Sequence, residues 1–216
     1  MDNFIKFTFD IFAHVIPGLM ILIALSLLTI SIKPPSVDKK IDNMEVTASE
    51  NSEMDFGLAS EIMSDLEGAG KGVAVVILAY IVGFAVNPLG KSIYRKIGPK
   101  LWPKIYVENE IKGMHISDKF VLIRELSPSN FEYVERWNMY SSLSHNLAVG
   151  CLVFFIVSVI QTFLQSDYWL YWISIAVISI ILFFVFVKSA FIYNQWAGRD
   201  LNSAISALNL REKAKQ

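Results

Sequence analysis

The stretch from 147 to 187, LAVGCLVFFIVSVIQTFLQSDYWLYWISIAVISIILFFVFV, decides the fold class of this chain. It contains two apolar runs, 147–164 and 169–187, and neither run holds a charged residue. A helix rises about 1.5 Å per residue, so each run approaches the thickness of a hydrocarbon core, about 30 Å. The short polar turn between the runs therefore predicts a hairpin of two transmembrane helices.

Two further runs, 11–32 and 72–88, are equally free of charge, and the four runs hold 17 to 22 residues each. The whole chain is 54% hydrophobic and only 18% charged, with a mean hydropathy of +0.45. A water-soluble domain of this size needs less apolar surface for its core. The sequence predicts an all-α polytopic membrane protein with four transmembrane helices and a small helical cytoplasmic region.

The charges are divided between the loops. Residues 33–70 hold nine acids against three lysines, whereas residues 91–145 hold nine bases against six acids. Lys and Arg near the ends of spans mark the cytoplasmic side, so the basic loop and both termini are expected in the cytoplasm. The first run has Asp2 and Asp10 beside Lys6 and no small-residue cleavage site, which predicts a retained anchor.

These boundaries divide the chain into seven segments. They are an N-terminal segment with the first span (1–32), an acidic extracytoplasmic loop (33–70), the second span (71–90), a basic cytoplasmic helical loop (91–145), the third span (146–165), the fourth span (169–190) and a cytoplasmic helical tail (191–216). Apolar residues at four-residue spacing predict a short amphipathic helix at 53–67 in the acidic loop.

The cytoplasmic parts are expected to be helical and to form a small bundle under the membrane. Pro88, Pro99 and Pro103 are expected to break the chain after the second span, and residues 117–126 are expected to form a short helix. Ser129 and Glu132 have the spacing of a capping box, which predicts the start of a helix that runs straight into the third span.

The predicted topology places most intramembrane polar residues at one depth, near the cytoplasmic side. This polar cluster, a candidate gate or binding ring, consists of Asp10, His14, Asn87, His145, Asn146 and Lys188. Polar groups in a low dielectric are costly unless they are paired, so these residues are expected to face one another. Asp10 and His14 are four residues apart on one helical face and could sense or carry protons. The competing interpretation is ordinary hydrogen bonding between helices, worth roughly 0.6 to 2 kcal/mol per contact.

Other residues are expected to shape or anchor the helices. Pro17 and Gly18 are a candidate hinge, because proline frees backbone groups within a helix. Small residues at Gly68, Gly72, Ala79 and Gly83 favour close helix packing by the second span. Trp169, Tyr171 and Trp172 predict one aromatic belt, and Trp196 predicts the other. The basic cluster Lys91, Arg95, Lys96, Lys100 and Lys104 is a candidate contact for anionic lipid, whereas the six acids in the same loop argue against nucleic acid.

No motif in the sequence predicts catalysis. The chain has one cysteine, Cys151, and three histidines on separate segments, and it has no nucleophile motif or phosphate-binding glycine loop. A non-enzymatic protein with no cofactor and no metal is therefore expected.

Three short patches carry a resemblance. They are residues 9–18 (FDIFAHVIPG), residues 80–83 (YIVG) and the stretch from Arg136-Trp137 to Asn146. They resemble a loose group of uncharacterised bacterial four-span inner-membrane proteins, some of which are regarded as membrane effectors of antiviral systems. The resemblance implies a bacterial inner membrane and nothing about catalysis. The chain departs from the group at Gly83-Phe84, where the group commonly has Gly-His.

The leading hypothesis is a non-enzymatic membrane module that assembles through its spans and responds through its cytoplasmic region to a ligand or a partner. A pore-forming or membrane-perturbing output is one version of it. The alternatives are a membrane anchor or scaffold for a soluble partner, and a lipid-acting enzyme at the interface that uses His14 or His145 as its base. The expected partners are the lipid bilayer, further copies of the chain and a soluble cytoplasmic protein.

Overall fold

The structure is a computed structural model and describes residues 2–28, 69–105 and 114–213. Within these residues all regular structure is helical, which confirms the all-α class. The helices are α1 (Asp2–Leu27), α3 (Ala69–Leu101), η1 (Pro103–Ile105), α4 (Ile116–Leu126), α5 (Pro128–Leu164), η2 (Ser166–Tyr168), α6 (Trp169–Ala207) and α7 (Leu210–Lys213). The amphipathic helix expected at 53–67 lies outside the described residues.

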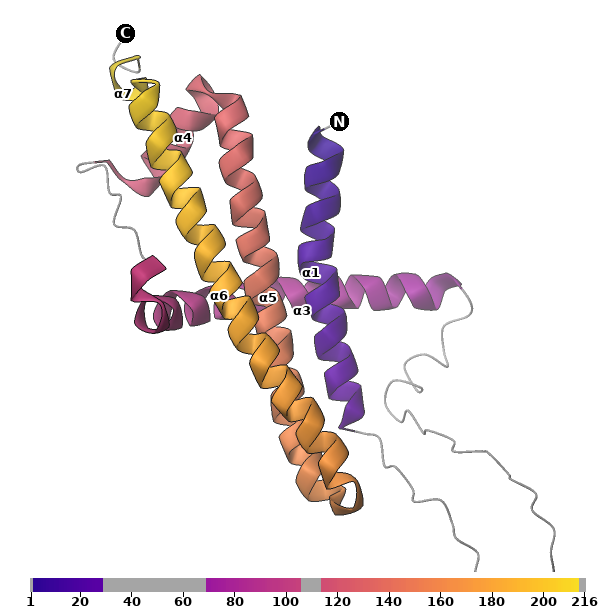
Figure 1. The fold of residues 1–216 in the computed structure, drawn as a ribbon. Helices are drawn as coiled ribbons and strands as arrows, with labels where there is room; N and C mark the ends of the chain where they lie inside the picture. The colour runs from indigo at the N-terminus through magenta and orange to yellow at the C-terminus, as the bar shows by residue number, and fades with distance from the viewer. Residues whose placement is uncertain (1, 29–68, 106–113, 214–216) are drawn as a thin grey trace, which may run out of the picture.

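The helices α5 and α6 form the predicted hairpin and run side by side along their whole length (Figure 1). By length and composition α3, α5 and α6 could each cross a membrane, and α1 adds a shorter apolar helix, Ile11–Leu27. A membrane-embedded protein is therefore supported, whereas the count of four spans stays a prediction. The start of α1 and the end of α7 lie at the same end of the molecule (Figure 1).

Two hydrophobic cores lie along the α5–α6 hairpin. The first joins the middle of the hairpin to α3 and is built around Tyr94, Cys151 and Val187. The second joins α4 and α7 to the hairpin end and is built around Ile123, Val134 and Leu201. This second core holds together what we call the terminal bundle: α4, residues 128–145 of α5, residues 188–207 of α6, and α7. It is the small helical bundle that the sequence predicts.

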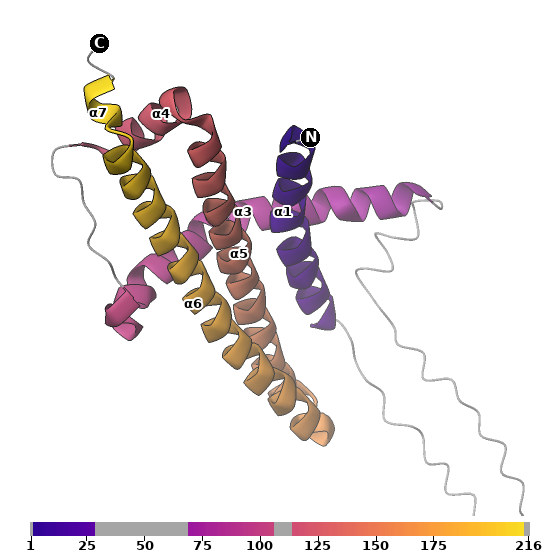
Figure 2. The same ribbon diagram turned by 45° about the horizontal axis from the view of Figure 1, so that its top comes forward.

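The direction of α3 differs from that expected of a second span. It runs across α1, α5 and α6 instead of alongside them, and its N-terminal turns extend beyond α1 (Figures 1 and 2).

Glycines explain how α3 can cross three helices. A side chain at Gly83 would meet the backbone of His14 in α1, one at Gly90 would meet His145 in α5, and one at Gly98 would meet the ring of Phe191 in α6. Steps of seven and eight residues correspond to about 10 and 12 Å along a helix, close to the 8–10 Å between axes of packed helices. Each crossing therefore falls on a glycine, because about two helical turns separate neighbouring helices.

Two local expectations were wrong. Pro88 and Pro99 do not break the chain, because α3 continues through both and ends only at Leu101, before Pro103. The helix α5 begins at Pro128 with Ser127 as its N-cap, so the predicted capping box at Ser129 lies inside the first turn. Proline suits this first position, since its fixed φ is helical and its missing N–H is not needed there.

Candidate functional site

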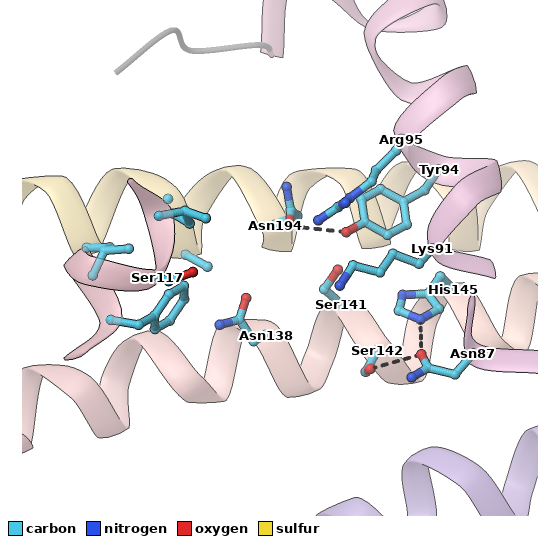
Figure 3. Close-up of a pocket in the computed structure, with 15 residues that line it drawn as sticks. Asn87, Lys91, Tyr94, Arg95, Ser117, Asn138, Ser141, Ser142, His145 and Asn194 are labelled. Atoms are coloured by element: carbon cyan, nitrogen blue, oxygen red, sulfur yellow. Dashed lines mark hydrogen bonds between the residues drawn. The ribbon is translucent and has the colours of Figure 1, made fainter. Parts of the chain in front are cut away.

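Two members of the predicted polar cluster, Asn87 of α3 and His145 of α5, meet where these helices cross. The Nε2 of His145 donates to Oδ1 of Asn87, and the hydroxyl of Ser142 donates to the same oxygen at 3.5 Å (Figure 3). Gly90 lets α3 approach this closely, since a Cβ there would lie 2.6 Å from the carbonyl oxygen of His145. These hydrogen bonds link α3 to α5 at their crossing.

A second polar contact ties α3 to α6. The phenol of Tyr94 donates to Oδ1 of Asn194 at 3.2 Å, and its ring stacks on His145 with 5.4 Å between centroids. Within the hairpin, the hydroxyl of Ser141 in α5 donates to the carbonyl of Ala190 in α6 at 2.9 Å. The three helices are thus linked in a frame of neutral hydrogen bonds.

A cavity of about 480 Å³ opens beside this frame, between α3, the first turn of α4, and the hairpin. It is lined by Asn87, Lys91, Tyr94, Arg95, Ile116, Ser117, Phe120, Asn138, Ser141, Ser142, His145, Asn194, Ala197, Gly198 and Leu201. None of these described lining residues is acidic. Lys91 and Arg95, one turn apart on α3, extend into the space (Figure 3). Neither cation forms an ion pair within the described part of the chain.

The start of α4 faces the same cavity through Ile116, Ser117 and Phe120. His115 is the N-cap of this helix, and its Nδ1 accepts a hydrogen bond from the backbone N–H of Ser117 at 3.3 Å. The N-terminal end of a helix carries partial positive charge. Asp118 lies in the same first turn and offsets this partial charge, so the positive charge of the cavity comes from Lys91 and Arg95.

Aromatic rings give the cavity a depth relative to a membrane. Trp137, Tyr140, Tyr193 and Trp196 form a cluster in which each ring lies within 4.8 to 5.9 Å of another. Tyr171 is exposed near the opposite end of α6, 22 residues before Tyr193, or about 33 Å away along the helix. That separation fits two aromatic belts on either side of a hydrocarbon core of about 30 Å. Because the cavity shares its turns of α5 and α6 with the ring cluster, a membrane crossed by α6 between these two belts would place the cavity at headgroup depth.

Trp172 departs from the belt that the sequence predicts. Its side chain is buried, and its indole N–H donates to Gln165 at 3.4 Å. Trp169 and Tyr171 remain exposed and can serve as the anchor.

His14 and Asn146 lie near the cavity but act between helices. His14 is buried at the crossing of α1 and α3, with its ring 5.5 Å from those of Tyr80 and Phe84. Asn146 is fully buried and donates from Nδ2 to the carbonyl of Ala13 in α1 at 3.0 Å. The side chain of Asp10 is outside the described structure, and so is the proposed pair of Asp10 with His14.

Lys188 does not join the cluster, which corrects its assignment to the polar ring. It is exposed on α6 and does not line the cavity. Val187 and Phe191 occupy the buried face of this helix, and Lys188 is turned by about 100° from Val187. The sequence predicts a similar depth for Lys188 and the other cluster residues, but Lys188 lies on a different face of its helix.

The structure divides the other sequence candidates in the same way. Of the basic cluster, Lys91 and Arg95 line the cavity, whereas Lys96, Lys100 and Lys104 are exposed elsewhere. Ala79 and Gly83 meet α1 at the crossing, where a side chain at Gly18 would strike the backbone of Ala79. A Cβ at Gly72 would contact nothing within 4 Å, and Gly68 lies outside the described residues. The helix α1 continues through Pro17 and Gly18.

Sequence reasoning missed most of the cavity wall, including Phe120, Asn138 and Ser141. A signal was present in α3, because Asn87, Lys91 and Arg95 recur every four residues and mark one polar helical face. Comparison of the chain with known proteins found no matching family model, no matching curated protein and no matching solved structure. The fold and the site together describe an all-α protein of the membrane-embedded class with a cationic cavity beside its terminal bundle.

Proposed function

We propose that this protein is a non-enzymatic integral membrane module that binds an anionic ligand in the cavity and transmits that binding to its membrane helices. The observation that carries the proposal is the cavity itself, in which Lys91 and Arg95 face a space with no acidic lining residue. Two like charges side by side repel each other, and a bound anion would remove that repulsion. In this proposal, the cytoplasmic region responds to the ligand, because the two cations and the cavity belong to it.

Transmission to the membrane follows from how the cavity is walled. The helix α3 supplies both cations, whereas α4, α5 and α6 supply the opposite walls. An anion that binds both sides would favour one position of α3 over the hairpin. Because α3 also crosses α1 at Gly83, a shift of α3 reaches the first helix as well.

A non-enzymatic role is supported by the state of His145. Its side chain is buried and its Nε2 donates to Asn87, so the histidine that the enzyme alternative requires already serves to hold the crossing of α3 and α5. Assembly through the membrane helices remains part of the proposal. The first half of α3 exposes large apolar side chains, including Val73, Ile77 and Phe84, that lipid or a second copy would cover.

The binding step is tested by thermal unfolding of the full chain in a neutral detergent with phosphate, sulfate or citrate as probes. At about 100 times its Kd, a ligand that binds only the folded state stabilises it by about 2.7 kcal/mol. We expect at least one multivalent anion to raise the midpoint, and the Lys91→Gln/Arg95→Gln double variant to lose the effect. These salts also stabilise proteins by exclusion from the surface, so the comparison is with the variant, and an equal rise of its midpoint would contradict the proposal. Ion leakage from proteoliposomes on anion addition is the readout for a pore-forming output.

The proposed orientation makes a separate prediction. We expect a reporter that is active only in the cytoplasm to give signal when it is fused after Gln216 and none when it is inserted near Asn51, because basic residues stay on the cytoplasmic side. Paired reporters active only outside the cytoplasm provide the control. The opposite pattern would place the cavity on the outer side of the membrane.

A further inference from the structure

The number and arrangement of hydrogen-bond donors in the cavity indicate which class of anion it would bind. We infer, on the basis of the anion site proposed above, that the cavity holds the phosphoryl group of a phosphate ester. A carboxylate offers two oxygens and one charge, whereas a phosphate monoester offers three terminal oxygens and a charge of about −1.5 to −2 at neutral pH. The cavity presents charged donors in two places and neutral donors in others, which matches the larger and more highly charged group.

The charged donors are suited to separate oxygens. Lys91 presents a compact ammonium near Ser141, and Arg95 presents a planar guanidinium on the side of Asn194 (Figure 3). Arginine binds phosphate oxygens in a bidentate manner, and lysine adds a point charge. Since both side chains come from one face of α3, they approach a bound group from the same side.

Neutral donors face these cations from the other helices. The amide of Asn138 in α5 points towards the cavity and forms no hydrogen bond to another described residue (Figure 3). Donors thus converge on one space from α3 and from α5.

The size of the cavity implies an organic group on the phosphate. About 480 Å³ lies within the range of about 300 to 1,000 Å³ typical of small-molecule sites. Ile116, Phe120 and Leu201 give one side of the wall an apolar character. At headgroup depth, the ester can arrive either as the headgroup of an anionic lipid or as a soluble metabolite.

The experiment compares matched ligands on the full chain in neutral detergent. The probes are glycerol 3-phosphate, its carboxylate analogue glycerate, and phosphatidic acid added to the micelles, with binding followed by the shift of the unfolding midpoint. We expect a phosphate ester to bind and glycerate to bind at least about tenfold more weakly, because it lacks the second charge and the third oxygen. Response to phosphatidic acid alone identifies a lipid source, and response to glycerol 3-phosphate identifies a soluble one.

Variants locate the binding. We expect Lys91→Gln and Arg95→Gln each to weaken the phosphate ester about tenfold or more, since each removes a charge-assisted hydrogen bond. Lys96→Gln and Lys100→Gln remove the same charge from exposed positions of α3 outside the cavity and are the matched controls. If the control variants lose as much affinity for the phosphate ester as Lys91→Gln and Arg95→Gln do, the assignment of the site to this cavity is overturned.

The outcomes separate this inference from the proposed function. Glycerate binding as tightly as the phosphate esters, with loss in Lys91→Gln, would overturn the phosphoryl assignment and leave the anion site standing. Binding of no anion at all would overturn both.

Discussion

Replacing Gly83 by leucine is expected to force α3 away from α1 and to give the larger loss of stability of the two substitutions considered in detail. A Cβ at this position would overlap the carbonyl of His14, and backbone cannot move aside as a flexible side chain can. Overpacking a well-packed site typically costs about 1–3 kcal/mol, and a backbone obstacle places this variant at or above the upper end. Gly18 against Ala79 makes the same contact one turn away, so neither helix can yield alone.

The matched control is Gly72→Leu, which makes the same substitution on the same helix. A Cβ at Gly72 would have no neighbouring atom within 4 Å, so leucine there should be neutral or slightly stabilising through its better helix propensity. Unfolding midpoints of the two variants in one detergent give the comparison. Equal tolerance of both substitutions would show that α1 and α3 do not cross at Gly83.

The sequence was sufficient for the elements that depend on local pattern. Uncharged runs as long as 147–164 predict helices by length and composition alone, and the structure has α5 and α6 there. The terminal bundle followed from helical patterns that continued past the runs, as at Leu201, which is buried in its core. In both cases, the residues that determine the structure lie within a single helix of the sequence.

Relations between elements were harder to predict. Lys188 and His145 have similar predicted depths, but the helical phase of α6 turns Lys188 away from the cavity. The crosswise path of α3 follows from which helix each glycine meets, and spacing alone does not name the partners of Gly83, Gly90 and Gly98. The cavity was hard to predict for the same reason, because its cations and its amides come from different helices.

The contact between Asn146 and α1 has a cause that a double-mutant cycle can isolate. In an α-helix the N–H of residue 17 would donate to the carbonyl of residue 13, but Pro17 has no N–H. The amide of Asn146 donates to that same carbonyl at 3.0 Å. A side chain of α5 thus supplies the hydrogen bond that proline removes from α1, at a buried position where water does not compete.

Asn146→Leu is therefore expected to destabilise the protein by about 1–3 kcal/mol, the typical effect of leaving a buried acceptor unsatisfied. In a Pro17→Ala background the same substitution should be much less damaging, because the N–H of alanine can satisfy Ala13 within the helix. Unfolding free energies of the four proteins in detergent give the coupling, and any effect of Asn146 that is independent of Pro17 cancels. Gln161→Leu is the control, since Gln161 donates to the carbonyl of Leu27 at the end of α1 and its loss should be the same in both backgrounds. If Asn146→Leu has the same effect with proline or alanine at position 17, the two residues are not coupled. Asn146 would then hold α1 for a reason unrelated to the missing N–H.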